Sequence, residues 1–263
     1  MKVLIMTDLE GISGVDSMEM ITAEGSDKNL FACRRLMADL NAAVAGCLDA
    51  GADEIYVVDG HGGARNFIPT LLHPSAMQLK GGAWEDLIRS GECAAYLEVG
   101  CHPMPGTFNG FLDHCQSSKS WYNYIVNGRK CGEIAQGALF AGAFSVPFVM
   151  VSGDDAACME ARALLGNIET ASVKVGVGRN HARCIPFDEA ESRIRSAARS
   201  GILRRTEIRP YRVSMPAELV LELYRTDMCD DLCAAHSEYD RIDARSVRKI
   251  TREITSYRDI LFY

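Results

Sequence analysis

Residues 2–14 read Lys-Val-Leu-Ile-Met-Thr-Asp-Leu-Glu-Gly-Ile-Ser-Gly, an apolar run that ends in two carboxylates and a glycine-containing turn. A short run rich in Val, Leu and Ile is typical of a buried parallel strand, and Asp8 and Gly11 mark its end. Asp8 and Glu10 are two residues apart, so in extended geometry both side chains project to one side. The segment therefore predicts a buried strand that delivers two acidic groups to its carboxyl end.

Helix and strand patterns alternate after this first strand. Apolar residues at helical spacing predict a helix over 30–50, and further strands are expected over 54–58, near 94–99 and over 147–151. This alternation favours an α/β fold with a largely parallel sheet flanked by helices.

The C-terminal part has a different pattern. Residues 219–224 alternate like an antiparallel strand, and residues 247–255 mix Arg with Ile and Val. Earlier in the chain, Asn127-Gly128 is a strong hairpin signal. We expect a metal-binding catalytic α/β domain over 1–205 and a smaller mixed α+β subdomain over 206–263, with a soft boundary near Thr206.

Composition and charge exclude several classes of protein. The 28 Lys and Arg residues against 35 Asp and Glu give a net charge of −7, and no basic stripe is present, so neither a nucleic-acid partner nor an anionic membrane is expected. No apolar run approaches the roughly 20 residues of a membrane span. The N-terminus lacks the pattern of a signal peptide, so the ten cysteines are expected to be reduced and the protein cytoplasmic.

Polar residues follow three of the predicted strands. Asp8 and Glu10 follow the first, His61 the second and His102 the third, at the strand ends where α/β sheets bind ligands. Carboxylate and imidazole groups together suit Zn²⁺, and paired ions serve hydrolysis. Spacing alone leaves a structural interpretation open, in which Asp8 ends a strand, Glu10 begins a turn and backbone hydrogen bonds hold His61.

Four short motifs, in order, give this sequence a specific resemblance. It resembles the D-aminopeptidase (DppA-type) family of zinc metallopeptidases through Asp8-Leu9-Glu10-Gly11-Ile12-Ser13-Gly14, Asp59-Gly60-His61, Gly100-Cys101-His102 and Gly132-Glu133. The similarity runs through nearly the whole chain and includes residues 146–155.

The resemblance implies a centre of two Zn²⁺ ions per chain, and the chemistry of zinc then predicts a metal-bound hydroxide as nucleophile. The ligands that it implies are Asp8, Glu10, His61, His102 and Glu133, with Asp8 as the bridge. It also implies an aminopeptidase for short peptides or amides that begin with a D-amino acid. A homo-oligomer, a decamer of two pentameric rings, follows from the same resemblance.

His114 matches the family's catalytic histidine. A metal-bound hydroxide would already supply the nucleophile, so we assign His114 to proton shuttling or oxyanion stabilisation, and a hydrogen-bonded core histidine is the structural alternative. Pro103, Asp113 and the end of the chain at Tyr263 depart from the family pattern. Asp113 in particular is expected to orient His114 or to raise its pKa.

Two other functions stay open. One is a di-metal hydrolase of another amide or of a phosphoester, and the other is a non-catalytic α/β binding protein. Asp154 is interpreted as a helix cap in preference to an acceptor for the substrate ammonium. Cys229, Cys233 and His236 are interpreted as one face of a packed helix in preference to a zinc site.

Overall fold

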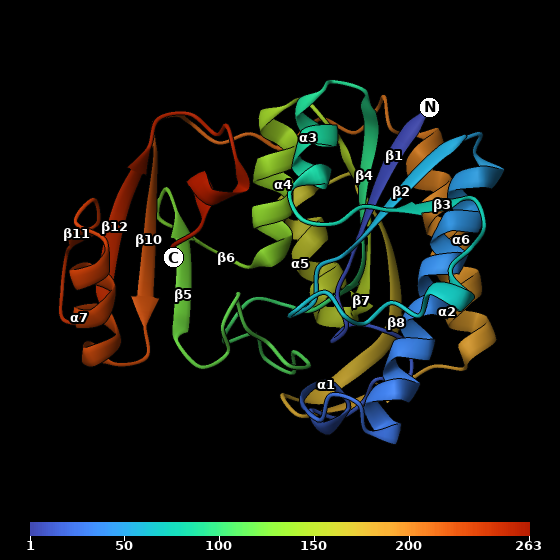
Figure 1. The fold of residues 1–263 in the computed structure, drawn as a ribbon, viewed down its shortest axis with the longest axis horizontal. Coiled ribbons are helices and arrows are strands. Elements are labelled where there is room, and N and C mark those ends of the chain that lie inside the picture. Colours follow the sequence, from blue (N-terminus) through green and yellow to red (C-terminus); the bar gives the residue numbers. More distant parts are fainter.

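A seven-stranded sheet forms the centre of the computed structural model, which describes residues 1–263 (Figure 1). Its neighbouring strands pair in parallel except β8 and β9, which are antiparallel. In spatial order the strands are β3 (Ala76–Gln78), β2 (Glu54–Asp59), β1 (Lys2–Thr7), β4 (Cys93–Cys101), β7 (Phe148–Asp154), β8 (Glu169–Gly178) and β9 (His181–Cys184). The expected α/β class is confirmed.

Strand β1 lies inside this sheet, as its apolar run predicts. Val3 and Ile5 join the core under one face and Leu4 joins the core under the other, so successive residues are buried on opposite sides. Thr7 pairs with Asp59 of β2 and with Val99 of β4. The residues that follow these three strands therefore emerge at the same edge.

Helices cover both faces of the sheet. Two of them, α2 and α6, pack together on one face, and α3, α4 and α5 lie on the other (Figure 1). The helices and 3-10 turns are α1 (Glu19–Thr22), α2 (Asp27–Asp49), η1 (Pro69–Leu71), α3 (Ala83–Arg89), α4 (Glu133–Ala143), α5 (Asp155–Leu165), α6 (Phe187–Leu203), α7 (Thr226–Ala235) and η2 (Tyr257–Ile260). No helix is both long enough and apolar enough to cross a membrane.

A second, antiparallel sheet of five strands lies beside α4 (Figure 1). Its strands, in spatial order, are β11 (Asp240–Arg241), β12 (Ser246–Thr251), β10 (Ala217–Leu223), β5 (Trp121–Val126) and β6 (Arg129–Cys131). The predicted hairpin turn joins β5 to β6 with positive φ at Asn127 (48°) and Gly128 (79°). This sheet takes strands from both sides of Thr206, and the domain boundary there stays a prediction.

The chain returns to the first sheet at its C-terminal end. The 3-10 turn η2 packs against α4, and the Tyr257 ring contacts those of Trp84 and Phe140. This contact brings a residue from the end of the chain next to two helices, α3 and α4, that cover one face of the central sheet.

Candidate metal centre

The loop after β1 lies directly on the end of β4. The Asp8 amide donates to the Val99 carbonyl (2.8 Å), and the Gly11 amide donates to the Gly100 carbonyl (2.7 Å). Gly100 has a φ of +89°, and a Cβ there would collide with the carbonyl oxygen of Asp8. Only glycine fits this crossing without strain.

Asp8, Glu10 and His61 form one group of potential metal ligands. The His61 Nδ1 lies 2.9 Å from Asp8 Oδ1 and 3.0 Å from Glu10 Oε2. One ligand atom from each residue lies within 4.8 Å of the other two. The strand ends thus bring together the first three predicted ligands.

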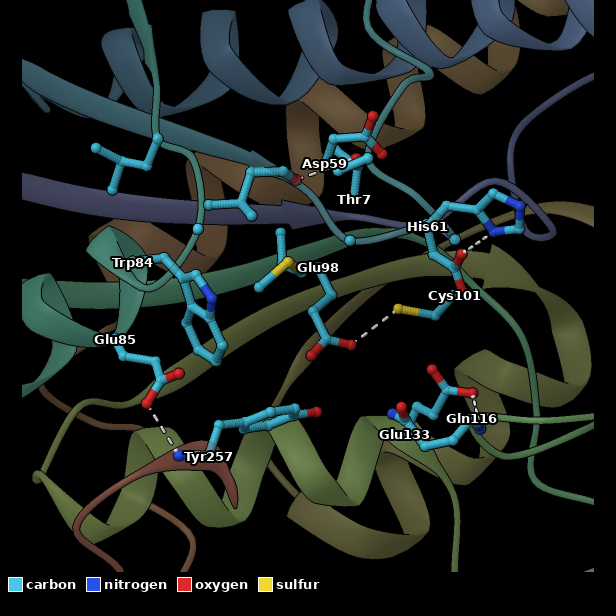
Figure 2. Close-up of a pocket in the computed structure, with 18 of the residues that line it drawn as sticks. Thr7, Asp59, His61, Trp84, Glu85, Glu98, Cys101, Gln116, Glu133 and Tyr257 are labelled. Atoms are coloured by element: carbon cyan, nitrogen blue, oxygen red, sulfur yellow. Dashed lines mark hydrogen bonds and ion pairs between the residues drawn. The ribbon is translucent and has the colours of Figure 1, made fainter. Parts of the chain in front are cut away.

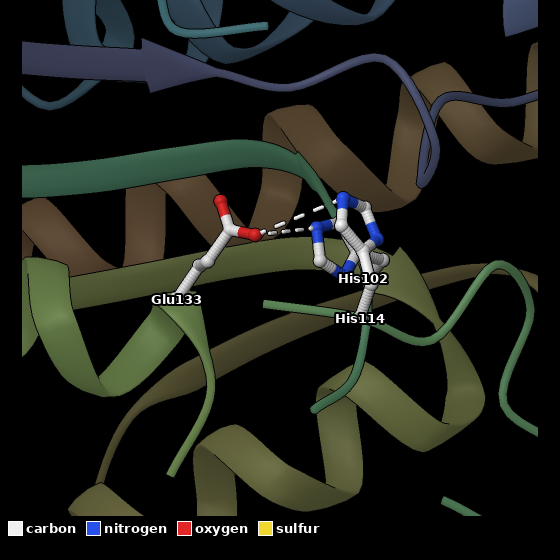
Figure 3. A group of neighbouring side chains, drawn as sticks. All are labelled: His102, His114 and Glu133. Atoms are coloured by element: carbon white, nitrogen blue, oxygen red, sulfur yellow. Dashed lines mark ion pairs between the residues drawn. The ribbon is translucent and has the colours of Figure 1, made fainter. Parts of the chain in front are cut away.

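His102, His114 and Glu133 form a second group (Figure 3). Glu133 is the first residue of α4, and its Oε1 lies 3.2 Å from His102 Nε2 and 3.9 Å from His114 Nε2. The same oxygen accepts a hydrogen bond from the Gln116 amide (2.6 Å). A helix start, a strand end and a loop therefore supply this group.

Asp8 connects the two groups. While its Oδ1 faces His61, its Oδ2 lies 3.3 Å from His102 Nε2. Burial raises the pKa of Asp8, but a hydrogen bond from His61 and the charge of His102 outweigh this and bring that pKa below its ordinary value. All the predicted ligands and His114 thus lie around one carboxylate.

Two buried atoms of this cluster lack a hydrogen-bond partner. They are Glu10 Oε2 and His102 Nε2. Glu10 Oε2 lies 3.0 Å from His61 Nδ1 and His102 Nε2 lies 3.2 Å from Glu133 Oε1, but these contacts do not have hydrogen-bond geometry. Unsatisfied polar atoms are costly to bury, whereas nitrogen and oxygen donors that converge on a common point are the arrangement a divalent cation requires. The residues present therefore fit a metal.

Backbone acceptors orient two of the histidines. The Nδ1 of His114 lies 2.8 Å from the Leu112 carbonyl oxygen, and the Nδ1 of His102 lies 3.2 Å from that of Pro103. Because each Nδ1 keeps its proton toward a carbonyl, the neutral form of each ring would leave Nε2, which faces the centre, free to bind a metal or a proton. Asp113 instead pairs with Arg179 (3.1 Å), so Leu112 and not Asp113 orients His114, contrary to expectation.

A buried lysine donates hydrogen bonds to the loop that carries Asp8 and Glu10. Lys174 of β8 is fully buried, and its Nζ donates to the carbonyls of Glu10 (2.5 Å), Ile12 (2.9 Å) and Val15 (2.6 Å). Burial lowers the pKa of Lys174 to about 8. Sequence reasoning missed this residue, although a lysine between Val173 and Val175 in a strand is the signal that could have revealed it.

A cavity of about 740 Å³ opens beside the ligand cluster (Figure 2). Asp8, His61, His102 and Glu133 line it at one end, and Trp84 and Tyr257 line its wall. Glu98 of β4 also lines it, and neither Glu98 nor Tyr257 was singled out from the sequence. The cavity gives a substrate access to the ligand cluster.

The remaining predictions concern residues outside this centre. Asp154 caps α5 as expected, because its Oδ1 accepts from the Ala157 amide (2.8 Å) and its Oδ2 from the Phe111 amide (2.8 Å). Cys229 and Cys233 lie on α7, whereas His236 follows its end. Neither potential metal group includes these three residues.

Comparison with known proteins assigns the chain to a family. The family model described as D-aminopeptidase matches residues 1–261. This chain belongs to the D-aminopeptidase family. The resemblance expected from the four motifs is confirmed, and so is the assignment to the peptide-bond hydrolases.

Two members of the D-aminopeptidase family illustrate the similarity. A D-aminopeptidase of Bacillus subtilis (strain 168) is 31% identical over 189 residues, which span 70% of this chain and 68% of the relative. The solved structure of the Zn-dependent D-aminopeptidase DppA from Bacillus subtilis, a self-compartmentalizing protease, matches with a TM-score of 0.90 and 22% identity. That match covers 99% of this chain and 95% of the other, and it shows a shared fold.

Proposed function

We propose that this protein is a zinc-dependent aminopeptidase that hydrolyses short peptides or amides with an N-terminal D-amino acid, and that it holds two Zn²⁺ ions per chain. The position of Asp8, whose two carboxylate oxygens face separate groups of ligand atoms, carries this proposal. The family, and the description of the related DppA structure as Zn-dependent, support the metal and the substrate class.

In this proposal Glu10 and His61 would hold one ion, His102 and Glu133 would hold the other, and Asp8 would serve both. Three carboxylates and two neutral imidazoles offset most of the charge of two such ions. When bound, Zn²⁺ ions acidify a water molecule and polarise a carbonyl group, which is the chemistry that amide hydrolysis requires.

His114 is proposed to move the proton. Its Nδ1 faces the Leu112 carbonyl, so its Nε2 can accept a proton from the attacking water and return it to the leaving amine. The Nε2 lies 3.9 Å from Glu133 Oε1, which places the proton carrier at the edge of the cluster.

A panel of D- and L-aminoacyl amides and dipeptides tests the activity with zinc-loaded protein. Hydrolysis of the D-substrates, with about two zinc equivalents per chain, is the expected result. Hydrolysis of L-substrates alone, or of none, would overturn the D-specific assignment. A phosphodiester in the same panel tests the alternative function, a di-metal hydrolase of phosphoesters. An enzyme of that kind would cleave the phosphodiester faster than the amides, and a D-aminopeptidase would not.

A homo-oligomer is also proposed. The related DppA is described as a self-compartmentalizing protease, which supports self-assembly of this chain. Light scattering of the purified protein measures the assembly mass directly. A decamer of two pentameric rings is the expected form, and a monomer would contradict it.

A further inference from the structure

Glu98 is a carboxyl group in the floor of the cavity, separate from the ligand cluster. It lies on β4, two residues after Tyr96, so both side chains project to the face of the sheet that α4 covers. Only 8% of Glu98 is exposed, and that part faces the cavity. A buried carboxylate in this position is expected to have a cationic partner.

No cationic side chain pairs with Glu98. The Tyr96 hydroxyl donates to its Oε1 (2.7 Å) and the Cys101 thiol donates to its Oε2 (3.1 Å). A carboxylate offers about four acceptor positions, so roughly two remain. Burial without a counter-charge raises the pKa of Glu98 to about 8, and a cation bound beside it would lower that pKa and favour the carboxylate.

Aromatic rings surround the same carboxyl group. In Figure 2 it lies between Trp84 on one side and Glu133 on the other, with the Tyr257 ring beside it. The Trp84 and Tyr257 rings contact each other edge to face, with 5.1 Å between centroids. A carboxyl group combined with aromatic rings is an arrangement that binds an organic cation.

The distance to the ligand cluster indicates which part of a substrate could reach Glu98. A Cβ on Gly137 would collide with Glu98 Oε1, so this oxygen lies against α4 at Gly137. Gly137 follows Glu133 by four residues on this helix, or about 6 Å along its axis. The α-amino group must stay beside the scissile carbonyl, so a longer group from the same residue is needed to reach Glu98.

The shape of the cavity gives the direction of the substrate. Its lining is buried at Tyr96 and Glu98 and exposed at Gly62, Gly81 and Gly82. An aminopeptidase holds the N-terminal residue at the closed end and releases the rest of the peptide through the open one. The N-terminal side chain is therefore the group that points at Glu98.

We propose that Glu98 is the specificity-determining residue of a subsite for a cationic N-terminal side chain. The substrates of this class are peptides or amides that begin with D-lysine, D-ornithine or D-arginine. This inference rests on the proposed function, because it names the residue that the same metal centre would release.

The test compares p-nitroanilides of D-lysine and D-norleucine, whose side chains have similar length and differ in charge. We expect kcat/KM to favour D-lysine and the ratio to fall by about 10- to 100-fold in E98Q, the range of a charged hydrogen bond. E98M should favour D-norleucine, and it provides a second variant if E98Q does not fold. The exposed E92Q is the matched control and should keep the wild-type ratio.

Two kinetic results would overturn the subsite. One is an unchanged ratio in folded E98Q and E98M. The other is an equal loss of activity on both substrates, which would show that Glu98 serves a shared part of the substrate or the fold.

A binding measurement separates this inference from the proposed activity. D-lysinol and D-norleucinol contain no hydrolysable bond, so calorimetry reports the subsite alone. If no amide is hydrolysed but D-lysinol binds more tightly than D-norleucinol, and E98Q removes the difference, the subsite stands and the proposed function fails. Equal binding of the two alcohols would overturn the subsite.

Discussion

The imidazole rings of His102 and His114 stack almost in parallel, with 3.9 Å between their centroids and 12° between their planes. His102 directly follows β4, and His114 lies in the loop leading to β5. The stack and the Leu112 carbonyl together fix the ring of His114. Its Nε2 is thus held toward Glu133, whereas its position in the chain alone would leave it free to turn.

Replacement of His114 by Ala is expected to lower kcat by about 10²- to 10⁴-fold, the usual contribution of a general acid or base. The zinc content should stay at the wild-type value, because the five proposed ligands remain. Steady-state kinetics and elemental analysis measure the two effects. The exposed His181 provides the control as H181A, and full turnover in H114A would remove His114 from the mechanism.

Replacement of Asp8 by Ala should remove both zinc ions, because Asp8 is the residue that faces both groups. Replacement of His61 or Glu133 by Ala should weaken one ion more than the other. Elemental analysis after dialysis should therefore give about zero equivalents for D8A and about one for each of the others. A D8A protein that keeps two ions would contradict the bridging position.

The sequence predicts the central sheet well because its signals are local. The apolar run before Asp8 is long enough to be a strand and too short to be a helix of ordinary length, and the pattern over 30–50 has helical periodicity. The topology of such sheets then brings strand ends together, so the approach of Asp8 to His61 and His102 follows from general rules. Asn127-Gly128 likewise fixes its turn through its own backbone preference.

Contacts between residues far apart in the sequence support the metal centre and pair the strands of the second sheet. Lys174 reaches the carbonyl of Glu10 from 164 positions along the chain, and β5 pairs with β10 across a long interval. No local pattern encodes such partners. Glu98 was missed for a related reason, since one acidic residue in a strand gives no indication of the cavity beside it.

Replacement of Lys174 by Met should destabilise the protein and weaken zinc binding. The variant leaves the carbonyls of Glu10, Ile12 and Val15 buried without their donor. We expect the free energy of unfolding to fall by about 2–4 kcal/mol, since unsatisfied buried acceptors cost about 1–3 kcal/mol each and the removal of a buried charge offsets part of this. Urea unfolding measures the change, and the exposed K28M is the control. Equal stability of K174M and wild type would show that the loop does not depend on this ammonium.

Glu98 should make the stability of the metal-free protein depend on pH. Its pKa rises from 4.5 to about 8 on folding, mainly through burial. The folded state therefore binds the Glu98 proton more tightly than the unfolded state does. The resulting contribution to the free energy of unfolding is complete below about pH 4.5 and is lost as the pH rises through about 8. It amounts to about 1.4 kcal/mol per unit of difference between the two pKa values. Asp39 and Glu160 titrate in the same direction, so the difference between wild type and E98Q isolates Glu98. Parallel stability curves from pH 5 to 8 would contradict it.

Replacement of Gly100 by Ala should disrupt the metal centre without changing any ligand. Gly100 has a positive φ, and an added Cβ would meet the Asp8 carbonyl oxygen, so the two loops must separate. Asp8 and His102 lie on these two loops, and their 3.3 Å approach would be lost. We expect G100A to lose at least one zinc ion and about 1–3 kcal/mol of stability, the usual cost of a backbone strain of this kind. G178A is the matched control, because Gly178 has an ordinary φ and no atom within 4 Å of an added Cβ. If G100A and G178A bound zinc equally well, the close crossing of the two loops would not be what holds Asp8 against His102.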